Sequence, residues 1–104
     1  MSEKVVIFTR LTAKPGRRGE LLTAFDALFQ AVGDEPGTEV FAMHAARDDP
    51  DAVCFYEVYR DDASLAVHRE SPALHDIVGR LGDLIAGAPE VTYALPRRAK
   101  GVSL

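Results

Sequence analysis

Cysteine and long hydrophobic runs are the scarcest features of this sequence. Its single cysteine, Cys54, has no partner for an internal disulfide and lies in an apolar stretch, which favours a packing role in a reducing compartment. Near the N-terminus the apolar run ends at Phe8, before Thr9 and Arg10, and it is too short for a signal-peptide core or a membrane span. We therefore expect a cytoplasmic protein with no membrane partner.

Nucleotide-binding motifs are also missing. The sequence contains neither GxGxxG nor GxxxxGK[ST], which argues against a nicotinamide or a nucleoside triphosphate without excluding every flavin. The net charge is -4, and the basic clusters at Arg17-Arg18 and Arg97-Arg98 have no interleaved aromatic residues. A nucleic-acid partner is therefore not expected.

Metal-binding motifs are absent as well. The histidines show no close helical pairing, there is no cysteine pair, and a proline separates His68 from His75. An iron site made of histidine and carboxylate is the alternative, but the pattern favours a chain with no metal and no other cofactor.

Hydrophobic periodicity predicts the order of the secondary structure. The predicted elements are a strand at residues 4–13, a helix at 17–32, strands at 38–45 and 52–59, a second helical region, and a last strand at 91–95. In the second helical region Asp61 offers an N-cap for a short helix, and Ser71 with Pro72 starts another, so this region is broken in two. Its later part has a predicted buried stripe, which consists of Leu74, Ile77, Val78, Leu81 and Ile85. Gly87 is expected to end it.

The length of 104 residues is that of one domain, at a size where pairing with another copy adds useful burial. We predict a single domain over residues 1–104, with its core at about 4–95 and a basic C-terminal tail at 96–104.

The order strand, helix, strand, strand, helix, strand is the ferredoxin-like α+β arrangement, an antiparallel sheet with both helices on one face. The strands are apolar on both sides, as Val5 and Ile7 show on one side of the first strand and Val6 and Phe8 on the other. The sheet face opposite the helices therefore needs cover. We expect it from a second subunit, in a homodimer that packs sheet against sheet.

Candidate acid and base groups gather where the third strand leads into the broken helix, and a cleft between helices and sheet is the expected ligand site. Because side chains alternate along a strand, Glu57 and Tyr59 share one side with Phe55. His68 follows on the helix that folds back over this strand end, so its imidazole can accept a substrate proton. The alternative for His68 is a partly exposed helix histidine without a function.

Three other positions have open alternatives. Glu57 beside apolar neighbours must be hydrogen bonded or have a raised pKa, unless it forms an ion pair with an arginine such as Arg10. His75 stands about 100° round the helix from Leu74, which favours a rim or solvent position. His44 lies either at the dimer face or at a strand end.

Three segments, taken together, carry a resemblance. They are EPGT at residues 35–38, YEVYRD at 56–61, and the stretch that runs from Leu65-x-x-His68 to Ser71-Pro72. With this strand order and length, the chain resembles the antibiotic biosynthesis monooxygenase family of small dimeric α+β-barrel proteins, over about residues 4–95. Members include quinol monooxygenases and anthrone oxygenases, which use dioxygen without flavin, haem or metal, and also haem-degrading relatives.

Carried onto this sequence, the resemblance implies a pocket aromatic at Tyr59, a pocket histidine at His68 and a polar strand residue at Thr9. Ala73 stands where several quinol-oxidising members have a histidine directly after the proline, which leaves His75 as a stand-in. The haem-degrading branch matches poorly, because its asparagine, tryptophan and axial histidine have no counterparts here.

Residues and resemblance together predict a cofactor-independent monooxygenase that oxidises an electron-rich phenol, hydroquinone or anthrone with dioxygen. His68 is the predicted catalytic base, and Tyr59 is predicted to hydrogen bond the developing oxyanion. Replacing His68 with alanine is expected to slow turnover and to leave folding nearly unchanged. The predicted substrate-binding residues are Ile7, Thr9, Phe41, Phe55, Glu57, Leu74 and His75.

Two alternatives to this function remain open. One is an isomerase or lyase that uses the same histidine and tyrosine to move protons without oxygen. The other is a dimeric module that holds an apolar metabolite in its cleft without transforming it.

Overall fold

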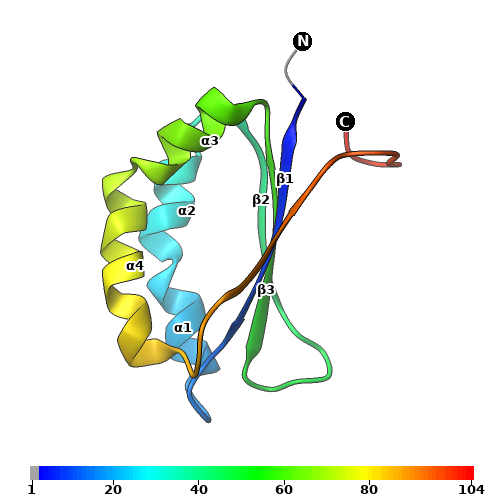
Figure 1. The fold of residues 1–104 in the computed structure, drawn as a ribbon. Helices are drawn as coiled ribbons and strands as arrows, with labels where there is room; N and C mark the ends of the chain where they lie inside the picture. The colour runs from blue at the N-terminus through cyan, green and yellow to red at the C-terminus, as the bar shows by residue number, and fades with distance from the viewer. Residues whose placement is uncertain (1–2) are drawn as a thin grey trace.

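The computed structural model describes residues 3–104 and shows an antiparallel sheet with helices on one face (Figure 1). The elements in chain order are β1 (Val5–Thr12), α1 (Arg18–Ala24), α2 (Asp26–Val32), β2 (Thr38–Ala45), β3 (Ala52–Tyr59), α3 (Asp62–Arg69), α4 (Pro72–Leu84) and β4 (Glu90–Ala94). The strands lie in the order β2-β3-β1-β4, and all neighbours are antiparallel. The predicted ferredoxin-like α+β fold is confirmed, and every strand ends within about one residue of its predicted bounds.

The first predicted helix, residues 17–32, is in fact two helices. Phe25 separates α1 from α2, and its amide bonds to Leu22 O at 3.3 Å, which tightens the chain to a spacing of three residues at this point. The Phe25 side chain points into the core, where its ring centroid lies 4.8 Å from that of Phe55. The apolar stripe predicted for one helix therefore continues across the break.

The helix α4 ends earlier than predicted. Its last residue is Leu84, and Ile85 is already extended and forms a bridge with Ala13. Ile85 is therefore not part of a helical stripe, because hydrogen bonds to the end of β1 pull this segment toward the sheet. The prediction that Val78 is buried is also wrong, since this residue is 56% exposed.

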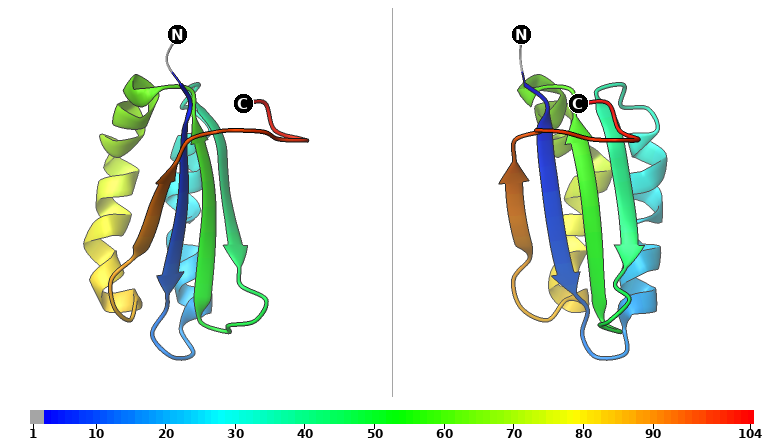
Figure 2. Two further views of the ribbon diagram at one scale, coloured as in Figure 1. Left: turned by 45° about the vertical axis from the view of Figure 1, so that its right-hand side comes forward. Right: turned by 90° about the vertical axis from the view of Figure 1, so that its right-hand side faces the viewer.

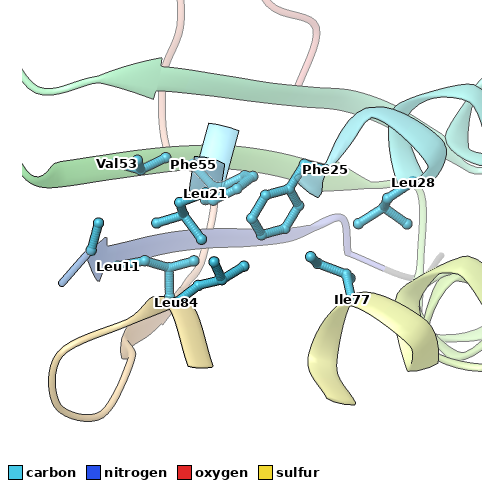
Figure 3. Close-up of a cluster of buried hydrophobic side chains, with 9 residues drawn as sticks. Leu11, Leu21, Phe25, Leu28, Val53, Phe55, Ile77 and Leu84 are labelled. Atoms are coloured by element: carbon cyan, nitrogen blue, oxygen red, sulfur yellow. The ribbon is translucent and has the colours of Figure 1, made fainter. Parts of the chain in front are cut away.

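The hydrophobic core between helices and sheet is divided into two clusters. The larger one is drawn in Figure 3 and includes Leu11, Leu21, Phe25, Leu28, Val53, Phe55, Ile77 and Leu84. The smaller one, around Ile7, Tyr59 and Leu65, lies toward the other end of the same sheet face. On β1 and β3 the polar residues Thr9 and Glu57 lie between the two clusters.

The other face of the sheet is partly covered by the C-terminal segment. This segment crosses the strands near one end of the sheet (Figure 2), and Lys4 Nζ donates a hydrogen bond to Ser103 O at 3.0 Å. Val6 and Val58 are buried on this face, whereas Phe8 remains 47% exposed. The predicted basic tail thus packs on the fold. Residues 1 and 2 of the predicted domain lie outside the described residues.

Across residues 3–104, none of the helices is both long and apolar enough to cross a membrane.

The turn before β2 packs closely against α3, and this contact can be tested with two glycines. A Cβ added at Gly37 would overlap the side chain of Ser64, which is held in place by a 2.7 Å hydrogen bond to Asp61. We predict that Gly37→Ala lowers the free energy of unfolding by about 1–3 kcal/mol. Gly79→Ala on α4 meets nothing within 4 Å and should raise the same quantity by about 0.5–1 kcal/mol. Urea denaturation measures both, and a Gly37→Ala variant as stable as the wild type would contradict the close packing.

Candidate functional site

A cavity of about 290 Å³ lies between the inner face of the sheet and the helices, and we call it the inner cavity. Its lining residues are Ile7, Thr9, Leu11, Phe25, Leu28, Phe41, Phe55, Glu57, Leu65, His68, Arg69, Leu74, Ile77, Val78, Leu81, Pro89, Val91 and Tyr93. Apart from the Tyr93 hydroxyl, the polar side chains in this set are those of Thr9, Glu57, His68 and Arg69. An apolar pocket with a few converging polar groups is typical of small-molecule sites.

His68 reaches the inner cavity because α3 folds back over the end of β3. The helix begins at the N-cap Asp61, whose carboxylate accepts a hydrogen bond from Ser64 N at 2.8 Å. His68 is 4% exposed, and its Nδ1 lies 2.9 Å from Glu35 Oε1, which also accepts a hydrogen bond from Thr38 Oγ1. A carboxylate at Nδ1 holds the proton on that nitrogen and leaves Nε2 of the neutral imidazole as the acceptor.

Two aromatic rings fix the plane of the His68 imidazole. Its centroid lies 5.2 Å from the ring centroids of both Phe41 and Tyr59. Removing this buried ring would leave a void and would take from the Glu35 carboxylate one of its two partners, leaving it the Thr38 hydroxyl. The expectation that His68→Ala leaves folding nearly unchanged therefore does not hold.

Glu57 and Tyr59 form a second buried polar pair, in which the Tyr59 hydroxyl donates a hydrogen bond to Glu57 Oε1. Burial raises the pKa of Glu57, and the hydrogen bond from Tyr59 and the nearby His68 oppose this effect. Burial and the adjacent Glu57 charge raise the pKa of Tyr59 well above its usual range, so the phenol stays a donor at neutral pH. Glu57 lines the inner cavity, whereas the fully buried Tyr59 stands behind it.

Arg10 does not neutralise Glu57. Its guanidinium points to the opposite face of the sheet, where Nη2 lies 3.1 Å from Asp49 Oδ2. The structure therefore resolves the two alternatives for Glu57 in favour of a hydrogen-bonded carboxyl with a raised pKa.

The structure brings most of the predicted substrate-binding residues together. The inner cavity is lined by Ile7, Thr9, Phe41, Phe55, Glu57 and Leu74. His75 is not among the lining residues, because it lies on the exposed side of α4, where its Nε2 is 2.9 Å from Arg69 O. His44 is exposed at the end of β2, with its Nδ1 3.3 Å from Cys54 O.

Sequence reasoning missed Glu35 and Arg69. Glu35 lies within the EPGT segment, but it is 33 positions from His68, and nothing in its local sequence indicates that contact. Arg69 follows His68 directly and lies over the Tyr93 ring, with its guanidinium carbon 5.5 Å from the ring centroid. The signal that was available for Arg69 is its place between a candidate base and a helix break.

Within residues 3–104, no three histidine, cysteine, aspartate or glutamate side chains come close enough together to hold a metal ion.

The raised pKa of Glu57 predicts how stability depends on pH. A carboxyl whose pKa rises on folding stabilises the fold most below its unfolded pKa, here about 4.5, and this contribution is lost as the pH rises through the folded value. Glu57→Gln keeps an acceptor for Tyr59 but has no charge to bury. We predict that the variant gains stability relative to the wild type between pH 4 and pH 8, as measured by urea denaturation. The exposed Glu70→Gln is the control, and a difference for Glu57→Gln that does not change with pH would contradict the prediction.

Comparison with known sequences and structures places the chain among small proteins of the same fold. The model of the family "Antibiotic biosynthesis monooxygenase" matches residues 4–80. "Putative monooxygenase Rv0793" from Mycobacterium tuberculosis is 27% identical over 92% of this chain and 94% of its own length. The uncharacterized protein sll1783 from a Synechocystis strain is 24% identical over 86% of this chain, and the chain spans 60% of the length of that relative.

Two solved structures have the same fold along nearly their whole length. The structure of Rv0793 gives a TM-score of 0.84 at 24% identity and covers 92% of this chain and 97% of its own. PA3566 from Pseudomonas aeruginosa also gives 0.84, at 22% identity, and covers 94% of this chain and 98% of its own. At this identity the structures establish the fold alone, whereas the family model spans well over half of the sequence. The chain belongs to the antibiotic biosynthesis monooxygenase family.

Proposed function

We propose that this protein is a cofactor-independent monooxygenase that oxidises an electron-rich phenol, hydroquinone or anthrone with dioxygen. The observation that carries the proposal is the buried His68, which contacts Glu35 through Nδ1 while it lines an apolar cavity. A base oriented in this way is suited to take a proton from a bound substrate through Nε2. The family supports oxygenase chemistry, and the substrate class is taken from the resemblance to quinol monooxygenases and anthrone oxygenases.

The inner cavity suits a small aromatic substrate. Its volume of about 290 Å³ is close to the lower end of ligand pockets, roughly 300–1,000 Å³. Its walls are supplied largely by aromatic and aliphatic side chains, among them Phe41 and Phe55. Such walls exclude water from the reacting groups and hold a radical pair together.

The proposed reaction begins with a proton transfer. His68 Nε2 takes a proton from the phenol O–H or from the acidic C–H of an anthrone, and the resulting anion gives one electron to dioxygen. The substrate radical and superoxide then combine by forming a C–O bond, and the peroxide takes the proton back from His68. In the last step the reacting carbon loses its remaining proton, the O–O bond breaks, and the carbon becomes a carbonyl. The second oxygen atom leaves as water, so dioxygen supplies all four oxidising equivalents.

We assign Tyr59 a different role from Glu57. The Tyr59 hydroxyl is engaged by Glu57, and its side chain does not reach the inner cavity. Tyr59 therefore acts as a positioning residue for the Glu57 carboxyl. Glu57 and Thr9 are the polar groups on the sheet that orient the substrate hydroxyl or carbonyl.

The role of His68 can be tested with an asparagine variant. The side-chain amide of His68→Asn can replace Nδ1–H as a donor to Glu35, but it offers no base at the position of Nε2. We predict that the variant folds and that oxygen uptake with hydroquinones and anthrones falls by ~10²–10⁴-fold after subtraction of autoxidation. The matched control is His75→Asn, which changes the same residue type on the exposed side of α4 and should keep full activity.

Other outcomes of this experiment favour the other functions. Uptake that is unchanged in His68→Asn would rule out His68 as the base. Substrate conversion that proceeds fully without oxygen would indicate an isomerase or lyase. Ligand binding with no conversion across the panel would indicate a binding module.

We further propose that the protein is a homodimer that packs sheet against sheet. Phe8 and Tyr56 stack on the outer face of the sheet with their ring centroids 5.4 Å apart, and Phe8 remains largely accessible there. Large exposed apolar side chains on one sheet face are typical of an interface. The C-terminal segment crosses this face near one end of the sheet (Figure 2).

The dimer can be tested by placing a charge on this face. We predict that light scattering at micromolar concentration gives twice the mass of one chain for the wild type and the mass of one chain for Phe8→Glu, because two buried carboxylates would face each other across the interface. Val67→Glu changes another exposed apolar residue, on α3, and should remain dimeric. A wild type that stays monomeric would contradict the proposal.

A further inference from the structure

We propose that Arg69 selects the substrate: the inner cavity takes aromatic molecules that carry a carboxylate, and Arg69 binds this carboxylate at the cavity mouth. The inference rests on the proposed function, because it assumes that an aromatic ring occupies the cavity beside His68. It adds a specificity-determining residue and narrows the substrate class.

The position of Arg69 is the first part of the argument. Arg69 is the last residue of α3, and its guanidinium reaches across to the ring of Tyr93 on the edge strand β4. This contact holds the cation in one place, since a guanidinium over an aromatic face is attracted by the ring. The neighbouring lining residues Val78 and Val91 are exposed, whereas Ile7 is buried, so this side of the cavity is the open one.

The charge of Arg69 is the second part. Within residues 3–104, no carboxylate lies at ion-pair distance from its guanidinium, although Arg10, Arg17 and Arg60 each have such a partner. The acidic side chains closest to the reacting region already have partners, because Glu35 binds His68 and Glu57 binds Tyr59. The positive charge of Arg69 is therefore free to bind a ligand.

The contrast between the two ends of the cavity is the third part. At the sheet, burial raises the pKa of Glu57 although the charge of Arg69 acts to lower it, which means that this end disfavours negative charge. At the cavity mouth, solvent and the Arg69 guanidinium favour negative charge. Arginine binds carboxylates with two parallel hydrogen bonds. A substrate with one anionic group therefore has a preferred orientation, with the carboxylate at Arg69 and the uncharged ring inside.

Binding of two matched ligands tests this inference without any turnover. The probes are 1-hydroxy-2-naphthoate and 1-naphthol, which differ only by the carboxylate, and their dissociation constants are measured anaerobically by titration calorimetry. We expect Arg69→Gln to weaken binding of the carboxylate probe by about 5–10-fold and to leave 1-naphthol unchanged, as expected for one charge-assisted contact at a partly exposed site. Arg69→Lys should keep part of the preference, and added salt should reduce it in the wild type.

Arg80→Gln is the matched control, because it removes the same charge from the exposed surface of α4 without touching the inner cavity. A carboxylate preference that survives in Arg69→Gln, or that falls equally in Arg80→Gln, would overturn the inference and leave the proposed function standing. A preference that depends on Arg69 without oxygen uptake for any substrate would overturn the proposed function alone. If the wild type binds neither probe, both the inference about Arg69 and the proposed function fail.

Discussion

The hydrogen bond between Glu35 and His68 holds together the part of the molecule on which the site depends. It joins the turn after α2 to the end of α3, and both side chains are almost fully buried. Removing Glu35 would leave Nδ1 of His68 without this partner, and removing His68 would leave the Glu35 carboxylate with the Thr38 hydroxyl alone; both changes are costly in a protein interior. The same contact sets which nitrogen of His68 faces the inner cavity. The close packing of Gly37 against Ser64 also holds this turn against α3.

The buried pair of Glu57 and Tyr59 makes the fold less stable than a continuous apolar core would be. A stretch of sheet that could have been continuous core instead holds a carboxyl and a cavity between two apolar clusters, and the phenol that binds this carboxyl belongs to the smaller cluster. Side chains chosen only for stability would fill this space with hydrocarbon. A polar pair kept in such a place is typical of a functional site, where stability is exchanged for a preorganised group.

The strands and the break before Pro72 could be predicted from the sequence because their signals are local: alternation, turn residues and capping residues. The alternation along β3 also predicted that Glu57 and Tyr59 share one side of the strand, and the structure shows that this side faces the helices. The interruption at Phe25 and the early end of α4 could not be predicted, because they arise from packing against Phe55 and from hydrogen bonds to β1. The partners of His68 and Arg69, which are Glu35 and Tyr93, could not be predicted either, because each comes from a segment that is distant in the sequence.

The strand β4 is short and lies at the edge of the sheet, and among residues 3–104 its one neighbouring strand is β1. It nevertheless supplies Val91 and Tyr93 to the wall of the inner cavity. Edge segments with few contacts open at a lower free energy than the centre of a sheet. Ligands can therefore enter and leave the cavity through transient opening of this strand while β1, β2 and β3 stay paired. The rate of ligand exchange then does not depend on the free energy of unfolding of the whole protein.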